Sequence, residues 1–159
     1  MAEFTHFNQN GDAVMVDVSE KKETVREATA YGKIVMSKEC FNKVKSGEMG
    51  KGDVLSVARI AGIMGAKKTS ELIPLCHILN LTKVEIDFAL LEEESAIEVT
   101  CIAKVAGKTG VEMEALTGVN IALLTIYDMC KAVQKDIVIS DIRLLSKTGG
   151  IHGDYFKEE

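Results

Sequence analysis

An aspartate and a lysine follow a long uncharged stretch of the sequence. No side chain from 115 to 127 carries a charge, and Asp128 and Lys131 then come three residues apart. On a helix this spacing places both side chains on one face. An exposed pair of this kind is usually a surface salt bridge that contributes little to stability. If the apolar surroundings partly desolvate the pair, the pKa values of both groups change and the lysine becomes a usable acid or base. The residues alone leave both interpretations open.

Two glutamates lie at the other end of the same stretch. Glu112 and Glu114 fall in the first turn of a helix expected over residues 111–135, where favourable interaction with the helix dipole is sufficient reason for them. A carboxylate can also accept two parallel N–H bonds from a guanine-like edge. Glu114 and Asp128 are separated by roughly 21 Å along such a helix. Either the ligand is long, or a second chain completes the site.

Three further residues are candidates for binding an anion. His77 follows the only proline of the chain, although an isolated histidine is more often structural than catalytic. Lys51 lies between two glycines at an expected helix start, where backbone N–H groups favour an anion. Lys147 precedes a glycine-rich loop. None of these segments is a P-loop, and together they are consistent with a phosphate ligand.

Composition limits the class of protein. The 159 residues are expected to form a single domain over 1–159, with flexible ends at 1–13 and 148–159. A net charge of −5 argues against binding to nucleic acid or to an anionic membrane. We see no secretory signal and no apolar run of membrane-spanning length, so we expect a cytoplasmic protein. The four cysteines are scattered and expected to be free thiols, and a metal site is not expected.

Apolar periodicity and turn residues predict an α+β fold. We expect strands at 13–19, 24–37, 81–91, 95–107 and 136–147, and helices at 37–47, 51–74 and 111–135. This order favours an antiparallel sheet with helices packed on one face. The helix at 111–135 is apolar nearly all round, which is typical of a helix buried on every side. One sheet cannot cover all of it, so we expect a homo-oligomer.

Long segments of the chain resemble the molybdenum cofactor biosynthesis protein C family, MoaC, whose members are cyclic pyranopterin monophosphate synthases. The resemblance rests on KGDVLSVARIAGIMGAKKTSELIPLCH, GVEMEALTGVNIALLTIYDMCKA and LLSKTGG, with MVDVSEK and ATAYGKI nearer the N-terminus. It implies a ferredoxin-like fold and a homohexamer, a trimer of dimers, with active sites at subunit interfaces. It also implies a lyase that converts a cyclic dihydro-GTP, (8S)-3′,8-cyclo-7,8-dihydroguanosine 5′-triphosphate, to cyclic pyranopterin monophosphate and pyrophosphate, without a metal or other cofactor.

The resemblance also implies roles for individual residues. Asp128 and Lys131 match a catalytic acid/base pair, and Lys51 matches a second catalytic lysine. Substrate-contacting segments match Leu75, Cys76, His77, Glu112, Met113 and Glu114, and the phosphate-binding surface matches Lys21, Arg26 and Lys147. The sequence departs from the family pattern at Ile78, where proline is expected, and at Ile151 and His152, where a polar pair is common. We therefore carry no role over to residues 151–154.

Two other functions fit the same residues. A non-catalytic, purine-nucleotide-binding regulatory domain on a ferredoxin-like scaffold would bind a purine triphosphate without releasing pyrophosphate. A purely structural oligomerisation module would use the charged pairs as salt bridges between chains, and Asp128→Asn would then destabilise the assembly.

Overall fold

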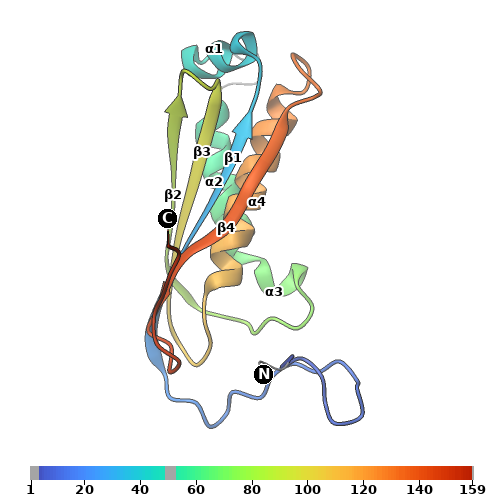
Figure 1. Ribbon diagram of the computed structural model, residues 1–159, viewed down its shortest axis with the longest axis vertical. Coiled ribbons are helices and arrows are strands. Elements are labelled where there is room, and N and C mark those ends of the chain that lie inside the picture. Colours follow the sequence, from blue (N-terminus) through green and yellow to red (C-terminus); the bar gives the residue numbers. More distant parts are fainter. Residues whose placement is uncertain (1–3, 49–52, 159) are drawn as a thin grey trace.

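The computed structural model describes residues 4–48 and 53–158, and Lys51 lies outside the described residues. Its elements are β1 (Thr24–Val35), α1 (Lys38–Ser46), α2 (Val54–Lys67), α3 (Thr69–Leu72), β2 (Leu81–Leu91), β3 (Ala96–Gly107), α4 (Glu112–Cys130), β4 (Val138–Thr148) and β5 (Tyr155–Phe156). The strands form one sheet in the order β2-β3-β1-β4-β5 (Figure 1), and each neighbouring pair is antiparallel.

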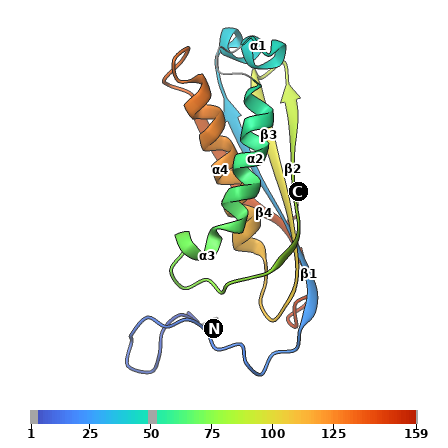
Figure 2. The same ribbon diagram turned by 180° about the vertical axis from the view of Figure 1, so that it is seen from behind.

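The first four strands have the ferredoxin-like topology. Helices connect β1 to β2 and β3 to β4, and the strand order from the β4 side is 4-1-3-2. Helices α2 and α4 lie side by side along one face of the sheet (Figure 2), with α1 at one end of the domain and α3 at the other. The predicted α+β class, with helices on one face, is confirmed.

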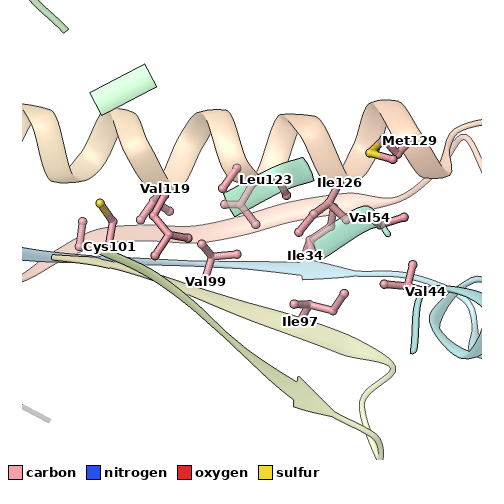
Figure 3. Packing of buried hydrophobic residues seen from close by; sticks show 14 of the residues in the cluster. Ile34, Val44, Val54, Ile97, Val99, Cys101, Val119, Leu123, Ile126 and Met129 are labelled. Atoms are coloured by element: carbon pink, nitrogen blue, oxygen red, sulfur yellow. The ribbon is translucent and has the colours of Figure 1, made fainter. Parts of the chain in front are cut away.

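The core lies between this face of the sheet and the two long helices. Along β1 the residues alternate between a buried and a half-buried face, as the period of two in a strand requires. Val99 on β3 lies under Val119 and Leu123 of α4, and Ile34 on β1 lies under Ile126 (Figure 3). Small residues bring α2 close to α4, because a Cβ on Gly62 would lie 2.9 Å from the carbonyl oxygen of Gly118.

Capping residues fix where the helices begin and end. The Ser37 side chain accepts a hydrogen bond from the Cys40 backbone N–H, and Gly47 ends α1 in the left-handed conformation with φ 73°. Asp53 accepts hydrogen bonds from the N–H groups of Leu55 and Ser56 at the start of α2. The helix predicted over 51–74 is divided at Lys68 into α2 and α3.

Several predicted elements differ from the structure. Residues 13–19 form no strand, and only an isolated bridge joins Ala13 to Phe7. Helix α4 ends at Cys130 instead of 135, because residues 131–133 form a turn. Strand β5 was not predicted. It exists because the chain turns back through a glycine-rich loop and pairs with the end of β4.

Apolar side chains remain exposed on the outer surface of the two long helices. Leu124 of α4 is 54% exposed, so this helix is not buried on every side within one chain. Val57, Ile60 and Met64 lie at helical spacing on α2 and are 44%, 59% and 54% exposed. Within the described residues, no helix has the length and apolar character needed to cross a membrane.

Candidate active site

One cavity brings together most of the predicted substrate-binding residues. It has a volume of about 430 Å³, within the usual range for small-molecule sites. The chain after α3, the first turn of α4, the end of β4 and the segment before β1 each form part of its wall. The predicted residues that line this larger cavity are Leu75, Cys76, His77, Glu112, Met113, Glu114, Lys21 and Lys147.

Two carboxyl groups lie in the wall that α4 contributes. Glu114 is only 4% exposed, and burial, together with the neighbouring Glu112, raises its pKa to about 7. Glu112 pairs with the ammonium group of Lys147 through Oε1, at 3.3 Å. Its other oxygen, Oε2, is buried and has no hydrogen-bond partner within the described part of the chain. The wall therefore contains a buried, unpaired acceptor next to a carboxyl group whose pKa is raised to about 7.

His77 is held in one orientation by the N-terminal segment. Its Nε2 lies 2.7 Å from the carbonyl oxygen of Val16. Because a carbonyl can only accept, Nε2 carries the proton and donates, which leaves Nδ1 available as an acceptor. The adjacent Cys76 is half-buried, and burial with the two nearby carboxylates raises its thiol pKa. A thiol in this state is a weak nucleophile.

A second, smaller cavity adjoins the first and contains three cationic side chains. Its volume is about 170 Å³, and Lys21, Arg26 and Lys147 line it together with the carboxylates Glu27 and Glu112, Thr109 and the loop at 150–153. Lys21 and Lys147 belong to both cavities. The smaller volume and the cations suit a phosphate group better than a base.

Arg26 holds the loop after β3, which borders the smaller cavity. The residue is 6% exposed, and its Nε and Nη2 donate to the carbonyl oxygens of Gly107 and Lys108 at 3.1 and 3.2 Å. Gly149 begins the other loop with φ 84°, and a Cβ there would lie 2.0 Å from the carbonyl oxygen of Val25. Only glycine fits this position.

The structure places Asp128 and Lys131 far from both cavities. They lie at the C-terminal end of α4, roughly 21 Å along the helix from Glu114. Lys131 Nζ donates to Asp128 Oδ1 at 2.6 Å, and the two side chains are 51% and 61% exposed. The desolvation considered from the sequence is therefore absent in the single chain. The hydrogen bond that Lys131 donates to the Asp128 carboxylate raises the pKa of Lys131 instead.

Sequence reasoning missed several residues of the cavity walls. The N-terminal segment contributes Thr5, His6, Val16 and Val18 to the larger cavity, and His152 lines both cavities. These residues have no periodic or motif signal, since tertiary structure alone brings their loops together. Thr109 and Gly110, directly before α4, could have been found from the affinity of helix N-termini for anions.

Among the described residues, no group of three or more histidine, cysteine, aspartate or glutamate side chains is placed to hold a metal ion. The four cysteines are free, as predicted.

A ferredoxin-like domain with two adjoining cavities, each lined by both carboxyl and cationic groups, has the features of an enzyme that binds a small molecule. A family model described as the MoaC family matches residues 15–150. Three curated relatives are each named cyclic pyranopterin monophosphate synthase. The one from Heliobacterium modesticaldum is 57% identical over 159 residues, with 100% of both chains covered. The one from Peptoclostridium acidaminophilum is 58% identical, with 98% of both chains covered. The one from Desulfitobacterium hafniense is 55% identical, with 99% of this chain and 96% of the relative covered. The chain belongs to the MoaC family.

Proposed function

We propose that the chain catalyses the reaction of a cyclic pyranopterin monophosphate synthase, a lyase of molybdenum cofactor biosynthesis. The substrate is (8S)-3′,8-cyclo-7,8-dihydroguanosine 5′-triphosphate, and the products are cyclic pyranopterin monophosphate and pyrophosphate. Family membership and the names of relatives that are 55–58% identical over nearly the full chain support this activity. The structural observation that carries the proposal is the pair of adjoining cavities, of which the larger includes the buried carboxyl group of Glu114 and the smaller includes the buried guanidinium group of Arg26.

The larger cavity would hold the guanine-derived part of the substrate. The edge of this guanine-derived ring offers an N–H and an amino group. A carboxylate of Glu112 or Glu114 can accept the hydrogen bonds from both. Oε2 of Glu112 has no partner in the described part of the chain but is buried, so the side chain would have to turn toward the ligand to accept one of them. Leu75, Cys76 and Met113 provide the less polar wall, and His77 can accept a proton or a hydrogen bond at Nδ1.

The smaller cavity would hold the phosphate chain. Forming the cyclic phosphate requires a substrate hydroxyl to attack the α-phosphorus while the bond to the leaving pyrophosphate breaks. The hydroxyl proton passes to a base, and the pyrophosphate leaves with the additional negative charge. Lys21, Arg26 and Lys147 line the place where that charge would develop, and cations there stabilise the transition state.

A second copy of the chain would supply the proton-transfer groups. Asp128 and Lys131 cannot reach the cavities of their own chain, since α4 is a rigid helix that separates them. We assign these two residues, contributed across a subunit interface, to the catalytic acid/base set, together with Lys51. Docking would also desolvate the exposed pair, which lowers the pKa of a lysine and makes it a better proton donor.

The assembly that fits this arrangement is a homohexamer built as a trimer of dimers. The exposed apolar side chains of α2 and Leu124 of α4 provide a surface for such contacts. The partners we propose are therefore the small-molecule substrate and further copies of the same chain. We propose no binding to nucleic acid or to a membrane. The location we propose is the cytoplasm.

The decisive experiment is incubation of the full chain with the cyclic dihydro-GTP, measuring both pyrophosphate and a fluorescent oxidised pterin. A synthase produces both. Binding of the substrate without either product would instead indicate the regulatory domain. The variant Asp128→Asn, at the C-terminal end of α4, distinguishes an enzyme from a purely structural oligomerisation module. It should abolish both products while the sedimentation coefficient of the assembly stays the same.

A further inference from the structure

His152 lies in a turn that hydrogen bonds hold in place on both sides. The turn runs from Gly150 to Gly153 and is closed by a hydrogen bond from the Gly153 N–H to the Gly150 carbonyl oxygen, at 3.3 Å. Before it, the Gly149 carbonyl accepts from the Thr24 hydroxyl at 2.7 Å. After it, β5 pairs with β4 beside Lys147. The exposed imidazole is thus presented from a defined loop.

The position of His152 is at the junction of the two cavities. It lines both of them, as do Lys21, Glu112 and Lys147. A phosphate chain that extends from the larger cavity into the smaller one has to pass these four side chains. His152 is therefore within the region where the triphosphate would lie under the proposed function.

The charge available in the smaller cavity is low for a polyphosphate. Its three cations are accompanied by two carboxylates, Glu27 and Glu112. Lys147 already pairs with Glu112 at 3.3 Å, and Glu27 pairs with Lys104 at 3.6 Å. Two N–H groups of Arg26 are used by backbone carbonyls. An additional positive charge would be needed to balance a bound pyrophosphate.

His152 is the histidine best able to provide that charge. Nδ1 of His6 lies 3.4 Å from the Val14 carbonyl, and Nε2 of His77 donates to the Val16 carbonyl. Within residues 4–48 and 53–158, His152 makes no hydrogen bond or ion pair, so both ring nitrogens remain available. Imidazole is the side chain that gains a proton most readily near neutral pH, and a neighbouring polyanion favours the protonated form.

We infer that His152 binds the phosphate groups that leave as pyrophosphate and takes up a proton from solvent as they bind. Protonation adds one positive charge to the cavity only while the polyanion is present, and the proton returns to solvent when pyrophosphate leaves. The imidazole forms no covalent bond. This inference rests on the proposed function of the site, and it adds a residue to which no role was carried over from the family.

The inference is tested with pyrophosphate alone on the full-length assembly. Calorimetric titration near pH 7, in two buffers of different ionisation enthalpy, gives both the affinity and the number of protons exchanged. His152→Ala should weaken binding about tenfold, the effect of losing one charge-assisted hydrogen bond. Because pyrophosphate itself titrates, the informative quantity is the difference in proton uptake between the original chain and His152→Ala. We expect this difference to approach one proton per site.

Two further variants distinguish charge from structure. His152→Lys should keep the affinity while losing the additional proton uptake, because the ammonium group is already charged. His6→Ala removes a histidine that lines only the larger cavity, and should retain the proton uptake. The same order of affinities should appear in product inhibition by pyrophosphate.

Equal affinity and equal proton uptake in the original chain and His152→Ala would overturn the inference. Loss of affinity in both His152→Ala and His152→Lys, with proton uptake unchanged, would also overturn it, since the loop and not the charge would then matter. A different result would contradict the proposed function without contradicting this inference. If the original chain binds pyrophosphate with His152-dependent proton uptake but releases none from the cyclic dihydro-GTP, then the reaction is wrong and the binding role stands.

Discussion

The two ends of α4 use similar residues in opposite environments. At the N-terminal end, Glu114 is buried beside a cavity, and its pKa is raised to about 7 because burial disfavours the charged form. At the C-terminal end, Asp128 and Lys131 lie exposed, and the pKa of the lysine is raised because the carboxylate stabilises its charge. One end is already shaped for binding in a single chain. Under the proposed function, the other end would become suited to proton transfer when another surface covers it.

The largest expected effect tests the role of the exposed end. Lys131→Ala should lower product formation by about 10²–10⁴-fold, the usual contribution of a general acid or base. The melting temperature should change little, since the pair is exposed and worth little to stability. The assay is pyrophosphate release from the cyclic dihydro-GTP. Turnover at the original rate would remove Lys131 from the catalytic set.

The next prediction concerns whether the two ends meet across an interface. Chains with Lys131→Ala and chains with Glu112→Gln should each be impaired, but unfolding and refolding them together should restore activity. If a site takes one end from each of two chains, about a quarter of randomly mixed sites contain both original ends. Recovered activity that rises with mixing would support a shared site. No recovery, with mixed assemblies shown by mass spectrometry, would place both ends in one chain.

A smaller effect follows from the raised pKa of Glu114. An acid whose pKa is higher in the folded than in the unfolded state destabilises the fold above the unfolded value, and the penalty is complete above the folded value. The destabilisation should therefore grow from about pH 4.5 to about pH 7. Glu114→Gln cannot ionise, so it should be more stable than the original chain at pH 8, by about 1–3 kcal/mol.

Urea unfolding at pH 5 and pH 8, at one protein concentration, measures this difference. Glu112→Gln serves as the matched control, because that carboxylate pairs with Lys147 and its loss gives no comparable gain at pH 8. A Glu114→Gln chain whose relative stability is the same at both pH values would show that the buried carboxyl does not titrate between them.

The smallest effect is expected for an ion pair that resembles the one at the end of α4 but has no proposed role. Lys43 pairs with Glu39 at 2.9 Å on α1, and both side chains are exposed. Lys43→Ala should change the free energy of unfolding by less than about 0.5 kcal/mol and leave turnover unchanged. A large loss of turnover would mean that charge in general, and not the position of Lys131, matters for activity.

The sequence predicted most of the fold because its main elements have strong local patterns. The alternation in β1, β2 and β3 and the helical spacing of apolar residues in α2 and α4 identified these elements. Residues 13–19 alternate as a strand should, yet they do not join the sheet, and their pattern instead places Val16 and Val18 at the cavity. Alternation shows which side chains share a face, but it does not specify which surface that face meets.

The candidate site was less predictable than the fold. Family resemblance identified Glu114 and His77, and the structure brings them together. The buried state of Glu114 and the position of His152 depend on how four separate segments pack, which no local pattern encodes. The sequence also could not predict that Asp128 is exposed in the single chain. The sequence pattern of an apolar helix is the same whether its own chain or another chain covers it.

The position of Arg26 on β1 depends on the register of this strand in the sheet. It lies on the helix-covered face of β1, opposite Val105 of β3, and from there it reaches the loop after β3. A slip of β1 by one residue would turn this side chain to the other face of the sheet. If the smaller cavity binds phosphate groups as proposed, such a misregistered chain would retain nearly the same circular dichroism spectrum while losing that affinity. Anion affinity would then be a more sensitive measure of correctly folded material than secondary-structure content.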